Sequence, residues 1–176
     1  MRVIEPKGRS GVPFAGYRTA TRLARALAQL YCDRAGRLAD SGKLDAAEHD
    51  AIAGLRLNPD NPRLYTVLGQ IRAERADYRG AFAAFDHALT LDPDLVVALS
   101  GRAATAYRVD DCARALSDLE RAIELAPDNP ALRFDYALVL QETGRWDEAL
   151  AELDAVASLT SMAGVNCRAV RDPRIV

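Results

Sequence analysis

Apolar residues recur along most of the chain at intervals of three and four, the spacing of one face of an α-helix. Residues 62–95 show the pattern most clearly, with two helical stretches separated by a short polar turn. Proline suits the first turn of a helix, as at Pro62, but costs about 3 kcal/mol in its interior, as Pro93 would. The pattern therefore predicts a hairpin of two helices. Their apolar faces consist of Tyr65, Leu68 and Gly69 in the first helix and Ala81, Phe85, Ala88 and Leu89 in the second.

This hairpin pattern repeats at a constant interval. The closing prolines, Pro59, Pro93 and Pro127, keep that interval, and three other sets of positions keep it through four repeats. A fixed period of this length is typical of repeat proteins in which neighbouring hairpins stack and share a core. The three sets are Ala47, Ala81, Ala115 and Ala149; Ala51, Phe85, Leu119 and Leu153; and Gly54, Ala88, Ala122 and Val156.

Small residues occupy one position on each predicted helix. Gly69, Ala103 and Ala137 recur on the first helices, and the alanine set beginning at Ala47 recurs on the second. Antiparallel helices pack with their axes about 8–10 Å apart, and the near end of that range requires small side chains at the contact. We therefore expect the two helices of each hairpin to be closely packed.

The 34-residue period, the small–large–small spacing and the Asn-Pro or Asp-Pro turns resemble the tetratricopeptide repeat (TPR) family. The resemblance covers about residues 28–163 and implies an all-α fold, a right-handed α-α superhelix or solenoid of about four helix-turn-helix repeats. The expected repeats are about 28–61, 62–95, 96–129 and 130–161 within a domain of residues 19–161. We expect residues 1–18 to form a flexible basic arm and residues 162–176 to form a C-terminal tail.

Members of this family are typically interaction scaffolds that hold a peptide or helix in a concave groove lined by the first helices. Tyr107 and Phe134 are candidate anchors, and the alternative is that both aromatic side chains pack within the solenoid or are incidentally exposed. A mildly apolar groove of this kind suits an amphipathic helix or an extended apolar segment. The repeat spacing assigns eight candidate groove residues: Arg63, Thr66, Gln70, Ser100, Tyr107, Phe134, Leu138 and Gln141.

One subset of the family uses Lys, Asn and Arg in the groove to bind the C-terminal carboxylate of a peptide. The corresponding places here hold Cys32, Gly36, Val67, Val97 and Gly101. The carboxylate clamp is therefore absent, and the C-termini of chaperones are not expected as ligands.

Charge and cysteine usage narrow the partners and the location. The net charge is −2, with basic residues concentrated near both ends and an acidic middle. A nucleic-acid-binding domain needs a basic patch on a folded face, so nucleic acid is not expected. Three cysteines without metal-type spacing predict neither a disulfide framework nor a zinc site. The chain shows no signal sequence or membrane span, and we expect a cytoplasmic protein without membrane partners.

The sequence contains no recognisable catalytic, metal-binding or cofactor-binding motif. His49 and His87 stand alone on predicted second helices, and the glycines form no phosphate-binding loop. The sequence therefore favours a non-catalytic scaffold or adaptor that binds a protein or peptide. The alternatives are an accessory module of a larger enzyme system and a nucleic-acid-associated protein that uses its basic N-terminus. The last repeat lacks a clear polar cap, so either the tail folds back as a short irregular cap or the last helix pair exposes an apolar edge. For an exposed edge we expect a homodimer through a terminal repeat.

Overall fold

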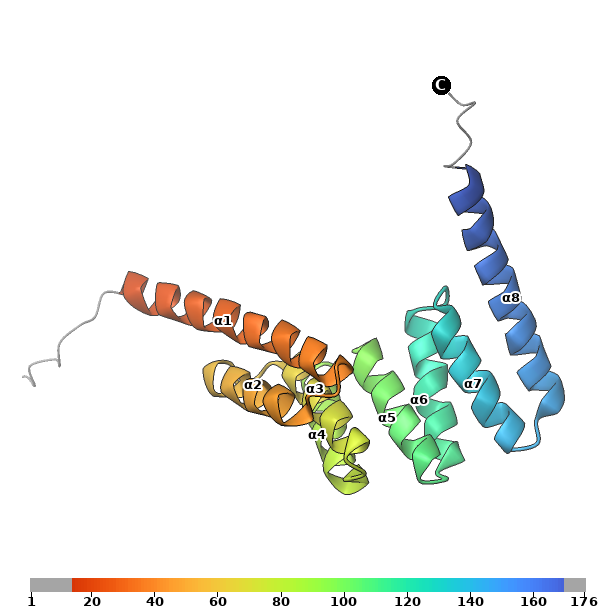
Figure 1. Ribbon diagram of the computed structural model, residues 1–176, viewed down its shortest axis with the longest axis horizontal. Coiled ribbons are helices and arrows are strands. Elements are labelled where there is room, and N and C mark those ends of the chain that lie inside the picture. Colours follow the sequence, from red (N-terminus) through yellow and green to blue (C-terminus); the bar gives the residue numbers. More distant parts are fainter. Residues whose placement is uncertain (1–13, 170–176) are drawn as a thin grey trace, which may run out of the picture. The chain divides into compact units, whose positions relative to one another are not determined.

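The computed structural model describes the backbone of residues 14–169 and the side chains of residues 19–160. This part of the chain forms eight α-helices and contains no strand, which confirms the predicted all-α class (Figure 1). They fall into two compact units that divide between Asp60 and Asn61. The helices are α1 (Phe14–Asp40), α2 (Leu44–Leu57), α3 (Pro62–Glu74), α4 (Tyr78–Leu91), α5 (Val96–Arg108), α6 (Cys112–Leu125), α7 (Pro130–Glu142) and α8 (Trp146–Ala169).

Each helix pair forms a hairpin, and the hairpins start at the predicted interval. In the C-terminal unit the first helices begin at Pro62, Val96 and Pro130, equivalent positions of successive repeats. Asn61 and Asn129 cap the two helices that begin with proline, because each side chain accepts a hydrogen bond from the backbone N–H two residues on. Successive hairpins pack together through α4 against α5 and α6 against α7. Each repeat of the sequence therefore corresponds to one helical hairpin of the structure.

The turn inside each hairpin uses one backbone conformation four times. Gly42, Ala76, Asp110 and Gly144 all have positive φ, between 59° and 76°, and each occupies the same place in its repeat. The next backbone N–H donates to the carbonyl oxygen five residues earlier, as from Asp77 to Arg72 at 2.9 Å. This is the Schellman motif, which satisfies carbonyl groups at the end of a helix and favours glycine.

Ala76 occupies this left-handed position at a cost that glycine avoids. The left-handed region costs a non-glycine residue about 1–2 kcal/mol, and glycine loses about 0.5–1 kcal/mol through backbone entropy. We therefore expect Ala76→Gly to raise the free energy of unfolding by about 0.5–1 kcal/mol, measured by urea denaturation. Ala83→Gly, an exposed change inside helix α4, should instead lower that energy by about 1 kcal/mol. A loss of stability in Ala76→Gly would contradict this explanation of the turn.

The core consists mainly of alanines around a few large side chains. Ala81 and Ala115 are completely buried, as predicted for the close contact within each hairpin. Phe85 on α4 is the largest fully buried side chain of the described residues, and its ring lies against Gly69 on α3 and Gly101 on α5. Phe85 therefore joins one hairpin to the next.

Two arginines tie helices together through buried carboxylates. Arg102 on α5 binds Asp118 on α6 through Nε at 2.8 Å and Nη2 at 2.7 Å, and its Nη1 lies 2.6 Å from Asp86 on α4. In the N-terminal unit Arg34 on α1 binds the buried Asp50 on α2 in the same bidentate way. The hydrogen bond from Arg34 lowers the pKa of Asp50 from its ordinary value. Both arginines therefore connect the two helices of a hairpin.

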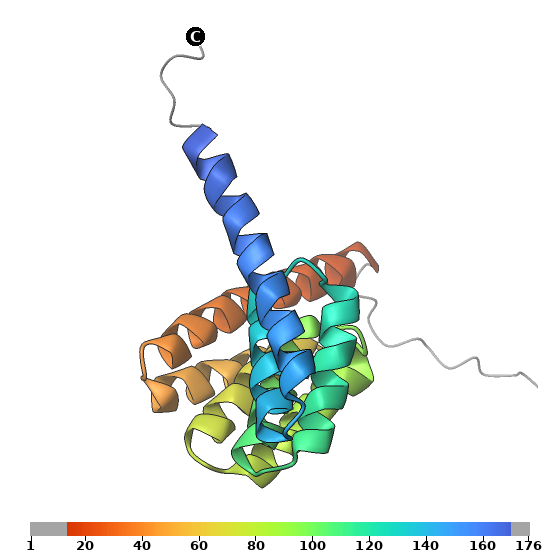
Figure 2. The same ribbon diagram turned by 90° about the vertical axis from the view of Figure 1, so that its right-hand side faces the viewer.

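The terminal helices extend beyond the predicted domain limits. Helix α1 begins at Phe14, five residues before the predicted start of the repeat domain at residue 19. Helix α8 continues to Ala169, eight residues beyond the predicted end of the repeat domain at residue 161, and its last turns project past the N-terminal end of α7 (Figure 2). Gly164 costs a helix about 1 kcal/mol, which is too little to end it. Residues 1–13 and 170–176 lie outside the described part.

Candidate functional site

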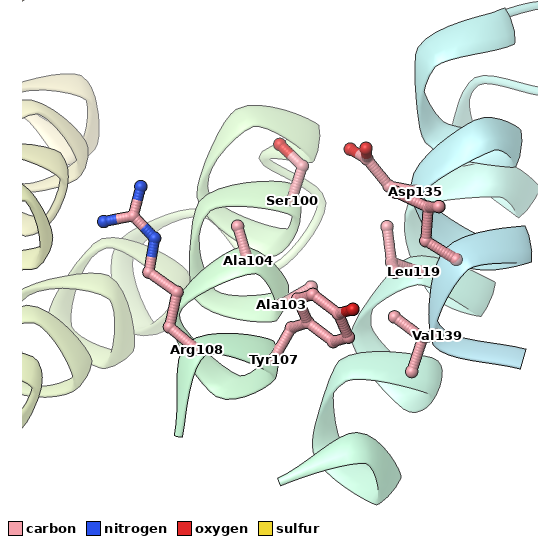
Figure 3. Close-up of a pocket in the computed structure, with 9 residues that line it drawn as sticks. Ser100, Ala103, Ala104, Tyr107, Arg108, Leu119, Asp135 and Val139 are labelled. Carbon is pink, nitrogen blue, oxygen red and sulfur yellow. The ribbon is translucent and has the colours of Figure 1, made fainter. Parts of the chain in front are cut away.

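The first helices of the C-terminal unit, α3, α5 and α7, pack side by side and form a surface that we call the first-helix wall. A pocket of about 260 Å³ opens on this wall between α5 and α7 (Figure 3). Its residues come from these two first helices and, through Leu119, from α6 behind them. The full lining is Ser100, Ala103, Ala104, Tyr107, Arg108, Leu119, Asp135, Leu138 and Val139.

The pocket has an apolar floor and a mixed mouth. Ala103, Leu119 and Val139 are buried and form the floor. Tyr107 and Leu138 are each 38% exposed, so both have apolar surface that a ligand can cover. In Figure 3 the Tyr107 ring extends from α5 toward Val139 on α7. The arrangement suits an apolar side chain inserted between the two helices.

Asp135 is the available charged group at the rim. Arg108 already donates to Glu74 Oε1 at 2.8 Å. The Ser100 hydroxyl donates to the Val97 carbonyl oxygen at 3.2 Å. Asp135 makes no side-chain hydrogen bond or ion pair with the described residues, and burial raises its pKa above the ordinary value. A cationic group of a ligand would therefore find an unpaired carboxylate here.

A second pocket continues the depression toward α3. Its lining includes Gln70 and Glu74 from α3, with Phe85 beneath, and its volume is also about 260 Å³. The two pockets therefore form one depression across the first-helix wall, running from α3 to α7. The residues common to both are Ser100, Ala104, Arg108 and Asp135.

The structure brings four of the eight predicted groove residues to this depression. Phe134 is exposed on α7 but lines neither pocket, which agrees with the alternative that this ring is incidentally exposed. Arg63 and Gln141 are not buried and also lie outside both pockets. The four that line the depression are Ser100, Tyr107 and Leu138 in the first pocket and Gln70, together with Ser100, in the second.

Thr66 is the candidate that the structure places out of reach. Its side chain is buried, with 3% exposure, and its hydroxyl donates to the Pro62 carbonyl oxygen at 3.0 Å. A threonine hydroxyl in a helix commonly satisfies itself on the preceding turn in this way. The Thr66 side chain is therefore not on the exposed surface of the wall, unlike the other seven predicted groove residues.

The main omission from the sequence prediction is Asp135. It occupies in α7 the place that Val67 occupies in α3 and Gly101 occupies in α5, two positions of the absent carboxylate clamp. Extending the series of Val67 and Gly101 by one more repeat identifies Asp135 from the sequence. Its lack of a partner, however, is visible only in three dimensions.

Metal-binding and membrane-spanning features do not occur among the described residues. No group of three or more His, Cys, Asp or Glu side chains there could hold a metal ion. None of the helices there is both long enough and apolar enough to span a bilayer. His87, one of the two histidines, packs its ring against Tyr65 at a centroid distance of 4.1 Å.

Repeated hairpins of this length, with an apolar depression on the first helices, define an α-helical repeat protein of the protein-interaction type. Two profiles described as tetratricopeptide repeat match the chain, one at residues 32–96 and one at residues 102–172. The chain belongs to the tetratricopeptide repeat family, and the predicted repeat superhelix is confirmed.

Relatives and solved structures agree with this assignment. The chain is 37% identical over 73 residues, 42% of its length, to the protein STIP1 homolog of Dictyostelium discoideum, and it spans 13% of that relative. The first TPR of Spaghetti (RPAP3) bound to the HSP90 peptide SRMEEVD has a TM-score of 0.63 and 22% identity, covering 68% of this chain and 95% of that one. YrrB, described as a TPR protein with an unusual peptide-binding site, has a TM-score of 0.61 and 24% identity, with coverage of 73% and 66%. At these identities the structures establish the fold.

Proposed function

We propose that this protein is a non-catalytic scaffold or adaptor that binds a peptide or helix of a partner protein along the first-helix wall. The observation that carries the proposal is the apolar depression with an unpaired carboxylate, Asp135, at its rim. Two structural relatives are described in connection with peptide binding, which supports the class of ligand. Cys32 and Cys112 form no disulfide within the described residues, which suits a reducing compartment, and the proposal places the protein in the cytoplasm.

The depression favours a ligand with an apolar anchor next to a cationic group. The anchor would enter the pocket between Tyr107 and Leu138, and an Arg or Lys of the ligand would approach Asp135. A peptide as acidic as SRMEEVD, the ligand of the Spaghetti domain, would instead meet repulsion from Asp135. A basic peptide is therefore the ligand that this wall favours, whereas the phosphates of nucleic acid would be repelled by Asp135.

Peptides selected by display on the wild-type protein would test this proposal. We expect the selected peptides to share an apolar residue near a Lys or Arg, and we expect Tyr107→Ala to weaken their binding about tenfold, as measured by calorimetry. Asp135→Asn should weaken binding only of peptides that contain the cation. Val109→Ala removes a similarly exposed side chain from a turn outside the depression and serves as the control.

Two results would contradict the proposal. One is an affinity for the selected peptides that is the same in Tyr107→Ala and the wild type. The other is a selection without any preference for basic residues. Circular dichroism spectra that match the wild type would exclude unfolding as the cause of lost binding.

The alternative role is that of an accessory module in a larger enzyme system. The observation that favours it is coverage, because the chain spans between 10% and 16% of the length of the curated relatives that it matches. One of these is cellulose synthase operon protein C of Escherichia coli K12, 32% identical over 120 residues. An enzyme whose activity depends on this protein and survives Tyr107→Ala would favour this role over peptide capture.

A further inference from the structure

The outer face of α8 is an exposed apolar stripe. Trp146 is 63% exposed and Leu150 is 61% exposed, and Leu153 continues the stripe at the next turn. The spacing of four and three residues places all three side chains on one face of the helix. Large apolar side chains gathered at one end of a repeat array mark a surface for association.

The repeat register shows what this face is shaped to receive. Leu150 and Leu153 are equivalent to Leu116 and Leu119 on α6, one repeat earlier. Leu116 packs against a buried cluster that includes Ala137 and Leu140 of α7, and Leu119 belongs to the same buried cluster as Leu132 of α7. In the middle of the array this face is therefore covered by the first helix of the next hairpin.

Helix α1 exposes the complementary face. Leu27 and Leu30 are exposed on it, and they border a shallow depression of about 320 Å³. Its remaining lining residues are Tyr31, Arg34 and Arg37.

The repeat register also shows what the α1 face is shaped to receive. Leu30 and Arg34 correspond to Leu132 and Tyr136, two residues of α7 that pack on α6. In the C-terminal unit, α7 thus covers α6, the second helix of the hairpin before it, through these positions. Helix α1 therefore has an exposed surface of the kind on which the second helix of a preceding hairpin packs.

Charge at these two faces matches in the same register. Within the chain, Asp86 on α4 binds Arg102 on α5, 2.6 Å away. One repeat later, Glu120 on α6 accepts a hydrogen bond from the Tyr136 hydroxyl on α7 at 2.8 Å. The corresponding residues at the open faces are Asp154 on α8 and Arg34 on α1.

The two residues are available for this pairing. Arg34 binds Asp50 of its own hairpin, as Arg102 binds Asp118. Arg102 also binds an acidic residue of the preceding hairpin, and among the described residues Arg34 has no equivalent second partner. The carboxylate of Asp154 makes no hydrogen bond or ion pair with the described residues. Residues 146–160 of α8 contain four acidic residues and no basic one, whereas the α1 face is lined by two arginines.

We propose that α8 of one molecule stacks on α1 of a second copy of this chain, with Asp154 paired to Arg34, so that the repeat array continues from one molecule to the next. This contact is heterologous, because it joins two different surfaces. It uses neither pocket of the first-helix wall, so self-association and peptide binding succeed or fail independently.

Two blocked variants test this head-to-tail contact. Leu30→Glu blocks the α1 face, and Leu150→Glu blocks the α8 face. Multi-angle light scattering should show wild-type assemblies that grow with concentration in the micromolar range, and each variant alone should be a monomer. An equimolar mixture should form a one-to-one dimer, because one intact α8 face and one intact α1 face remain. Val109→Glu, at an exposed turn outside both faces, should behave as the wild type.

A fluorescence readout identifies the surface directly. Trp146 is the single tryptophan of the chain, and it lies in the exposed stripe. Its emission should shift to shorter wavelength as the wild type assembles and should stay constant in Leu30→Glu. Asp154→Arg should weaken assembly about tenfold, since it replaces an attraction with a repulsion toward Arg34.

Three outcomes would overturn the proposal. The first is a wild type that stays monomeric across that concentration range. The second is a Leu30→Glu variant of wild-type size, which would indicate a symmetric contact between two α8 faces. The third is a mixture of the two blocked variants that stays monomeric while both keep the circular dichroism spectrum of the wild type.

Discussion

Replacing Arg102 with leucine is expected to lower the free energy of unfolding by about 3–5 kcal/mol, because the change leaves a buried carboxylate without its partner. Asp118 is almost completely buried, and Arg102 donates two hydrogen bonds to it from the neighbouring helix. The same guanidinium also binds Asp86, so one side chain connects α4, α5 and α6. Urea denaturation followed by circular dichroism would measure the loss.

Arg121 provides the matched control for this prediction. It also binds carboxylates on two sides, Asp94 at 2.7 Å and Glu124 at 2.9 Å, but all three side chains are exposed. Exposed ion pairs contribute about 0–1 kcal/mol, so Arg121→Leu should change stability little.

A double variant separates the two causes of the Arg102 effect. Arg102→Leu/Asp118→Leu removes the unpaired buried charge and should recover much of the lost stability. Equal losses in the Arg102 and Arg121 variants would contradict the importance of burial. A double variant that is no more stable than Arg102→Leu would also contradict it.

The sequence predicted the hairpins accurately because their determinants are local and repeated. Helix starts at Pro62 and Pro130 depend on the residue type at a single position, and the small residues recur where helices must approach closely. The chain ends were predicted less well. Helix α8 continues to Ala169 because nothing between Leu159 and that residue costs enough to stop a helix.

The polar ties between helices were not predicted. Arg34 pairs with Asp50 and Arg102 with Asp118 at the same separation in sequence, which has no meaning until the register of the hairpin is known. The two pairs lie two repeats apart, so an aligned view of the repeats contains the signal. Once one such ion pair is known from a structure, the aligned repeats therefore predict the equivalent pair in another repeat.

The candidate site was predicted in part, for a related reason. Repeat spacing gives the helix face on which a residue lies, and this was enough for Ser100, Tyr107 and Leu138. It does not give the depth of a side chain, which is why Thr66 was included although it is buried. Where two helices leave a gap depends on the volumes of all the neighbouring side chains together.

The Phe85 ring determines the size of one of these gaps, the one between α3 and α5. Phe85→Ala is expected to lower the free energy of unfolding by about 3–5 kcal/mol. The ring is 1% exposed and lies between α3 and α5, beneath the second pocket. Its removal leaves a cavity that the helices can close only by moving together. Because α3 and α5 form part of the first-helix wall, we expect peptide binding to weaken as well as stability. Chemical denaturation and calorimetry would measure the two effects.

The two glycines beside Phe85 allow a stricter test of whether its ring determines the spacing of α3 and α5. An ideal Cβ at Gly69 or at Gly101 would lie 2.7 Å from Cε1 of the ring, closer than real Cβ contacts come. Gly69→Ala should therefore cost about 1–3 kcal/mol in the wild type through overpacking. In a Phe85→Leu background the same substitution should cost clearly less, because the shorter side chain leaves room for the methyl group. A cost that is equal in both backgrounds would show that the ring does not determine the spacing of α3 and α5.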